Sequence, residues 1–115
     1  MSSTAHAKFV AYSSAISELE RPLAFIDVAA FDQNADWVET ETAGKPIRVG
    51  SKSIRSRDLI ARLLSRGSRY VGVLAYSALE AAHLIRNGVR DVVIAYPTMS
   101  RNGISQALKL SLIHI

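Results

Sequence analysis

The sequence predicts an α/β fold, in which helices cover a parallel sheet, and two observations lead to this class. Four short apolar runs of strand length recur at nearly regular intervals, at residues 22–28, 46–51, 70–76 and 91–97. The stretches between them have helical period, and each is closed by a glycine in the position that follows a helix C-terminus, at Gly44, Gly67 and Gly88. Continuous apolar strands that alternate with helices are typical of βα units, and about four such units are predicted.

Serine residues predict where two of these helices begin. Ser56 and Ser77 each precede an apolar stretch with helical period, and serine is among the side chains that cap helix N-termini. Glu80 follows Ser77 at the spacing of a capping box. Asp58 falls in the first turn after Ser56, where the helix dipole favours an acid. We therefore predict helices that start directly after Ser56 and directly after Ser77.

Two further helices are predicted in the first part of the chain. The stretch 31–44 has helical period, with Asp32 as its expected cap. Trp37 lies within this stretch and is the side chain expected to anchor the helix in the core. An N-terminal helix is expected over residues 8–20.

Composition places the chain among ordinary globular proteins. It has 115 residues, of which 49% are hydrophobic and 21% charged, enough for one small domain with a modest core. The net charge of +4 comes from scattered cations, whereas nucleic-acid binding needs a clustered basic stripe. The absence of cysteine excludes disulfides and thiolate sites. The first residues lack the pattern of a signal peptide, and no apolar run has the length of a membrane span, so we expect a cytoplasmic protein without a membrane partner.

The organisation of the chain leaves two alternatives open. A (β/α)₈ barrel needs about 250 residues, so four βα units form either a small open sheet or part of a larger architecture. The final predicted helix runs directly into "LSLIHI", without the glycine that closes the earlier helices. We therefore expect a helical extension at 1–21, a partial α/β domain at 22–109, and a truncated or non-native tail at 110–115.

Lys52 is the candidate catalytic residue. With the period of two of a strand, Arg48, Gly50 and Lys52 project from one face, and Lys52 lies where the strand gives way to a helix. This is the end of the strand at which α/β enzymes place their sites. Partial burial and a neighbouring cation both favour a neutral amine, which attacks aldehydes. The alternative is a lysine that merely extends into solvent at the rim of the sheet.

Three blocks of sequence resemble a known enzyme family. They are "PLAFIDVAAFDQNADWV", "RVGSKSIRS" and "GVLAYSALEAAHLIRNGVRDVVIAYPT", in this order within residues 22–98. Together they are similar to the N-terminal part of the fold-type III pyridoxal-phosphate enzymes, the alanine racemase N-terminal-domain family. The likeness is greatest to the D-threonine aldolase and D-serine dehydratase branch, which includes bacterial proteins described as amino acid deaminase/aldolase.

The resemblance implies roles for particular residues. Lys52 matches the lysine that forms the Schiff base with pyridoxal 5′-phosphate, and Arg48 matches an arginine lower on the same strand. Tyr76 and Tyr96 end strands, so either they line the cofactor cleft or they are rim aromatics that close the core. The implied fold is a partial (β/α)₈ barrel of the TIM type. Some members of the branch also bind a divalent metal, through C-terminal residues that this chain does not contain.

Two arginines and three histidines are the remaining polar candidates. Arg55 and Arg57 flank a predicted helix start, where the helix dipole disfavours cations. Either a nearby phosphate or carboxylate compensates them or solvent does. The three histidines, His6, His83 and His114, lack the spacing of a metal site.

The expected function is therefore that of an N-terminal fragment of a pyridoxal-phosphate-dependent lyase or racemase. Its substrates would be small D-amino acids or 3-hydroxy amino acids. We expect the fragment to be inactive by itself and the full-length protein to be a homodimer. Two alternatives remain: a non-catalytic protein of cofactor homeostasis with the same barrel and lysine, and a small stand-alone α/β interaction domain.

Overall fold

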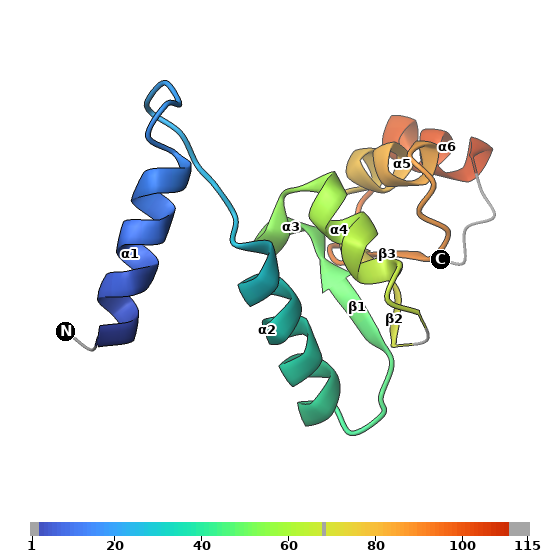
Figure 1. Cartoon of the computed structure of the whole chain (residues 1–115). Helices are drawn as coiled ribbons and strands as arrows, with labels where there is room; N and C mark the ends of the chain where they lie inside the picture. The colour runs from blue at the N-terminus through green and yellow to red at the C-terminus, as the bar shows by residue number, and fades with distance from the viewer. Residues whose placement is uncertain (1–2, 68, 111–115) are drawn as a thin grey trace. The chain divides into compact units, whose positions relative to one another are not determined.

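A computed structural model describes residues 3–67 and 69–110 (Figure 1). The chain divides into two compact units, Met1–Phe31 and Asp32–Ile115, and each is described by itself. Of the predicted tail 110–115, residues 111–115 lie outside the described residues. No helix in the described part of the chain is both long and apolar enough to cross a bilayer.

The first unit contains α1 (Ser3–Ala15) and the beginning of α2 (Val28–Glu41). The Tyr12 hydroxyl donates a hydrogen bond to the Asp27 carboxylate, and the Tyr12 and Phe25 rings lie 5.3 Å apart. The other Asp27 oxygen accepts the Ala30 N–H at 2.9 Å, which caps α2. These hydrogen bonds lower the pKa of Asp27, and the bond to Asp27 raises the pKa of Tyr12.

Two predictions for this region are wrong. Residues 22–28 do not form a strand: residues 23–27 are irregular, and Val28 already begins α2 after the Asp27 cap. The N-terminal helix exists, but α1 begins and ends about five residues before the predicted range of 8–20. This apolar run of strand length therefore leads into α2, whose first turn is capped by Asp27.

The second unit is built on a parallel sheet of three strands. β1 (Ile47–Gly50), β2 (Tyr70–Ala75) and β3 (Val92–Ile94) pair in the order β1-β2-β3. Val73 is in register with Val49 on one side and with Val92 on the other. The predicted α/β class with a parallel sheet is therefore confirmed. Three of the four predicted strands form, and β1 and β3 are the edges of the described sheet.

Capped helices connect these strands. α3 (Ser51–Ile54) and α4 (Arg57–Leu64) lead from β1 to β2, α5 (Ala78–Arg86) leads from β2 to β3, and α6 (Arg101–Lys109) packs against α5. The side chain of Ser56 accepts the Leu59 N–H, and that of Ser77 accepts the Glu80 N–H. Both predicted N-caps are confirmed.

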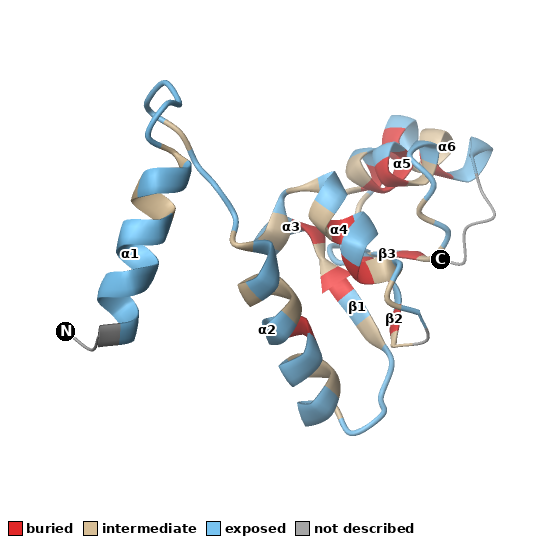
Figure 2. Cartoon of the chain, in the orientation of Figure 1, coloured by how far each residue is buried: buried red, intermediate tan, exposed pale blue. Residues whose placement is uncertain are grey.

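The core lies between the sheet and the helices α4 and α5. Val49, Val73 and Val92 are buried neighbours in register, and Val73 is 0% exposed. Figure 2 shows the buried residues gathered where the strands meet these helices. On the opposite face, Leu74 and Val93 are register partners and are 39% and 38% exposed. One face of the sheet is therefore covered and the other is open.

Charged residues join α2 to α4 within the second unit. Asp32 accepts two hydrogen bonds from the Arg62 guanidinium, the shorter at 2.5 Å, and Arg66 pairs with Asp36 and Glu39. Arg62 lowers the pKa of Asp32 through these bonds. The prediction that Asp32 caps the helix is wrong, because α2 begins at Val28.

The predicted anchoring role of Trp37 is also wrong. Its side chain is 63% exposed, whereas Ala35 is the buried residue of α2. The Ala35 carbonyl accepts the Tyr70 hydroxyl at 3.2 Å. A small residue is therefore the buried one of α2, and its backbone meets Tyr70 of β2, whereas the acidic side chains of α2 pair with Arg62 and Arg66.

Candidate functional site

A pocket of about 680 Å³ lies in the second unit, at the carboxyl ends of β1 and β2. Its lining includes Lys52, Tyr76 and Tyr96, which are three of the four residues that the sequence singled out. Each follows a different strand: Lys52 comes two residues after β1, Tyr76 directly after β2, and Tyr96 two residues after β3. Parallel strands bring their carboxyl ends to one edge, so the topology places these side chains around one cavity.

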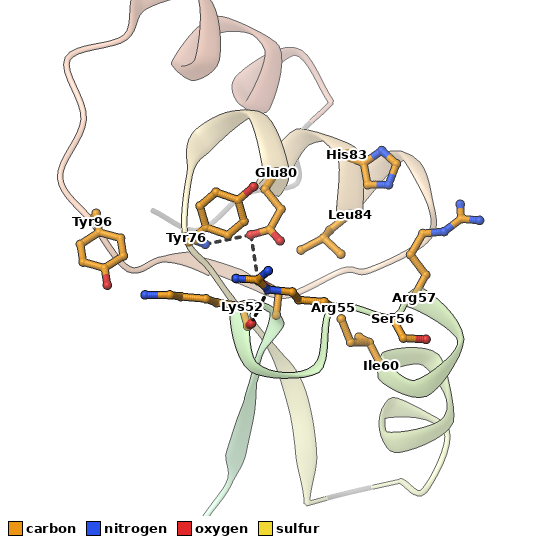
Figure 3. A pocket seen from close by; sticks show the side chains of 11 residues that line it. Lys52, Arg55, Ser56, Arg57, Ile60, Tyr76, Glu80, His83, Leu84 and Tyr96 are labelled. Carbon is orange, nitrogen blue, oxygen red and sulfur yellow. Dashed lines mark hydrogen bonds between the residues drawn. The ribbon is translucent and has the colours of Figure 1, made fainter. Parts of the chain in front are cut away.

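Lys52 is the second residue of the short helix α3, and its side chain is exposed. The strand ends at Gly50, so the expected strand face shared by Arg48, Gly50 and Lys52 does not extend to the lysine. Figure 3 shows the side chains of Lys52 and Tyr96 extending toward the same end of the pocket. An exposed amine beside an aromatic ring can meet a ligand from solvent.

Arg48 does not line this pocket. Its guanidinium pairs with the Asp91 carboxylate at 2.7 Å, across the middle strand of the sheet. Gly72 is the register partner of Arg48, and a Cβ at Gly72 would collide with the Asp91 carbonyl oxygen and lie 2.8 Å from the Asp91 Cβ. The absence of a side chain at Gly72 therefore leaves the space in which Asp91 lies.

Ser51 and Glu80, for which the sequence predicted no role in the site, form hydrogen bonds at the base of the pocket. The Ser51 hydroxyl, in a residue only 2% exposed, donates to Glu80 Oε2 at 2.8 Å and lies 3.3 Å from the Leu74 carbonyl oxygen. The same Glu80 oxygen accepts the Tyr76 N–H at 2.8 Å. Glu80 thus ties the start of α3 to the end of β2, next to Lys52.

The capping-box spacing was the sequence signal for Glu80, but it predicted a different partner. In a capping box the glutamate would reach back to the N–H of Ser77. Here its backbone N–H is capped by Ser77 while its carboxylate extends beyond the helix to Tyr76 and Ser51. Nothing in the local spacing indicates Ser51, because the two residues lie on different βα units.

Cations form one wall of the pocket. Arg55 has a φ of 52°, in the left-handed region, where it ends α3, and its Nε donates to the Lys52 carbonyl at 3.0 Å. Arg57 begins α4, and its Nη1 donates to Asn87 Oδ1 at 2.6 Å. With Lys52, three cationic side chains line the cavity beside one carboxylate, that of Glu80. The arrangement can offer an amine nucleophile and positive charge to the same ligand.

One of the three histidines lines the pocket. His83 lines the pocket, His6 lies in α1, and His114 is outside the described residues. Among the described side chains, no group of three His, Cys, Asp or Glu residues is arranged to hold a metal ion. The pocket lining thus combines one lysine, two arginines and one glutamate with His83 and with serine and tyrosine hydroxyl groups.

Comparison of the chain with protein-family models, with curated proteins and with solved structures found no match. The residues that line the pocket, and the strand ends that carry them, are therefore the observations that bear on function.

Proposed function

We propose that this chain carries the cofactor-binding lysine of a pyridoxal-phosphate-dependent lyase or racemase acting on small amino acids. The observation that supports this most directly is the meeting of Lys52, Tyr76 and Tyr96, from the carboxyl ends of three parallel strands, in one pocket. Open α/β sheets and βα barrels bind their ligands at this end of the strands.

The pocket fits this cofactor in size and in charge. Its volume of about 680 Å³ falls within the range of about 300–1,000 Å³ that is usual for small-molecule sites. Two tyrosines offer aromatic faces for a pyridine ring, and three cations offer partners for a phosphate group. The single lining carboxylate, Glu80, already accepts hydrogen bonds from Ser51 and Tyr76.

Each residue then has a defined part. Lys52 Nζ would be the amine that holds the cofactor through its aldehyde carbon. The bound cofactor supplies an electron sink for breaking bonds at the substrate Cα. Lys52 Nζ would also be the base in this pocket that could hold a proton from the substrate Cα. Tyr96 packs at the Lys52 end of the pocket, and Glu80 holds α3 in place through Ser51.

The barrel belongs to the same proposal. The sheet face that carries Arg48, Gly50, Leu74 and Val93 is open, and in a closed barrel it would be the interior. Both edge strands can pair with further βα units, which would also supply the remaining cofactor contacts and a metal site. This extension predicts that the open face becomes buried in a longer chain.

Covalent labelling tests the role of Lys52. The chain is incubated with pyridoxal 5′-phosphate, reduced with borohydride, digested and mapped by mass spectrometry. We expect the label on Lys52, saturating at one equivalent, and its loss in Lys52→Ala. Lys45→Ala is the matched control, because Lys45 is exposed and lies before β1, at the opposite end of that strand. A label spread evenly over the lysines, or an undiminished visible absorption band in Lys52→Ala, would refute the proposal.

A further inference from the structure

A second cavity lies between α4 and the C-terminal end of α5, and its volume is about 320 Å³. Apolar side chains from both helices and from the turn after α5 make up most of its lining: Ile60, Ala61, Leu64, Leu84 and Val89. We call this cavity the α4–α5 groove. Its volume is near the lower limit of the range of about 300–1,000 Å³ that is usual for small-molecule sites, so it suits a small ligand.

The floor of the groove belongs to the core, whereas its rim is accessible to solvent. Ile60 and Leu84 are 3% and 4% exposed, and Leu64 and Val89 are half-buried. Ala61, which also lines the groove, is exposed. A hydrocarbon chain placed here would leave water and contact apolar side chains of both helices, which is favourable. The groove therefore favours a ligand with an apolar chain.

Arg57 is the one charged residue among the described residues that line the groove. Its Nη1 donates to Asn87 Oδ1 at 2.6 Å, and Asn87 Nδ2 donates to the His83 carbonyl at 2.7 Å. Asn87 therefore orients the guanidinium, while Nε and Nη2 of Arg57 have no hydrogen-bond partner among the described residues. A guanidinium can bind a carboxylate through two parallel N–H bonds. Because the described lining contains no carboxylate to neutralise Arg57, the groove favours an anionic ligand.

The cation and the apolar surface follow one another along α4. Arg57 is the first residue of α4 and Leu64 is the last, so the cation belongs to one end of the groove and the apolar lining continues to the other. In Figure 3 the Arg57 side chain extends past Leu84, away from Lys52. Arg57, Ile60 and Leu84 also line the Lys52 pocket, so the two cavities adjoin, but Lys52 does not line the groove. A ligand with a carboxylate at one end of a hydrocarbon chain therefore meets complementary groups along the whole groove.

We propose that the α4–α5 groove is a second binding site, which takes a small alkyl carboxylate. The carboxylate accepts N–H bonds from the Arg57 guanidinium, and the hydrocarbon chain lies over Ile60, Leu64 and Leu84. Binding is reversible and non-covalent, and it does not depend on the role of Lys52.

Three ligands separate the effect of the charge from that of the chain. Octanamide has the shape of octanoate without its charge, and acetate has the charge without the chain. Each is titrated into the full ¹⁵N-labelled chain, and binding is read from the shifts of assigned backbone amides. We expect saturable binding of octanoate, with the largest shifts at the groove residues Ala61, Leu64, Gly88 and Val89. Octanamide should bind at least about fivefold more weakly, because it lacks the charge-assisted hydrogen bonds to Arg57, and acetate should not bind.

Two variants assign the binding to the groove. Arg57→Gln should bind octanoate and octanamide equally, because the charge is gone. Ala61→Phe should bind neither, because the ring fills the groove from an exposed position. Arg101→Gln is the matched control and should behave as the unaltered chain, because Arg101 is exposed, begins α6 and does not line the groove.

The dispersion of the amide spectrum establishes that each variant is folded. The site is wrong if octanoate does not bind saturably, if its shifts centre on amides outside the groove, or if octanamide binds equally well to the unaltered chain. It is also wrong if folded Arg57→Gln keeps the preference for octanoate, or if folded Ala61→Phe still binds it.

Discussion

Glu80 holds the floor of the pocket, and replacing it with alanine removes two hydrogen bonds at once. The carboxylate accepts the Ser51 hydroxyl and the Tyr76 N–H, each at 2.8 Å. A hydrogen bond to a charged group contributes about 1.5–3 kcal/mol. Ser51 keeps its contact with the Leu74 carbonyl and the Tyr76 N–H can bond to water, so the loss is less than the sum. We expect Glu80→Ala to lower the free energy of unfolding by about 2–4 kcal/mol.

This loss is a large part of the stability of so small a protein. At about 0.05–0.15 kcal/mol per residue, a chain of 115 residues has a total of roughly 6–17 kcal/mol. Urea unfolding followed by circular dichroism measures the difference. Glu80→Gln keeps the size of the side chain and one oxygen acceptor without the charge, so we expect about half of the loss.

The control is Glu41→Ala, at the exposed C-terminal end of α2, which we expect to change the free energy of unfolding by less than about 0.5 kcal/mol. If Glu80→Ala and Glu41→Ala unfold in urea with the same midpoint and the same slope, the Glu80 carboxylate does not connect α3 to β2. The positioning argument for the Lys52 helix would then be refuted.

Two further predictions concern the sheet and the α2–α4 ion pairs. Gly72→Ala places a methyl group against the Asp91 carbonyl and should lower the free energy of unfolding by about 1–3 kcal/mol, measured in urea. Gly50→Ala is its control, since a Cβ there meets only Ser53 Oγ at 3.7 Å; equal midpoints for the two variants would contradict the reasoning. The hydrogen bonds from Arg62 hold the pKa of Asp32 below its usual value of 3.8. The ionised carboxylate therefore stabilises the fold above that pH, and this stabilisation is lost as the pH falls through the folded-state pKa. Asp32→Asn should therefore lower the stability at neutral pH and flatten its dependence on pH below about 4, and an unchanged acid limb in pH-dependent urea unfolding would disprove the assignment.

Elements whose signals are local could be predicted from the sequence. Ser56 and Ser77 cap helices because a side-chain oxygen needs only an N–H three residues away, so the spacing contains the whole interaction. β1, β2 and β3 could be predicted because a short, continuous apolar run between two helices is typical of a buried strand in a parallel sheet. The same order of elements placed Lys52, Tyr76 and Tyr96 at the carboxyl ends of strands, where the pocket lies.

The partners of many side chains depend on the fold and could not be predicted from near neighbours in the sequence. Residues 22–28 have the composition of a strand, yet Asp27 accepts the Ala30 N–H there and a helix begins at Val28. Trp37 is exposed because α2 turns its acidic side chains toward α4.

The pocket residues show the same division. Arg48 was expected beside Lys52, but Asp91 neutralises it across Gly72, and Glu80 engages Ser51 on another βα unit. Charged and hydrogen-bonding groups pair with whatever the fold brings within about 3 Å. Each of these residues lies tens of residues away from its partner along the chain, so local periodicity cannot predict the pair. Helix caps and strand periods, in contrast, depend on near neighbours.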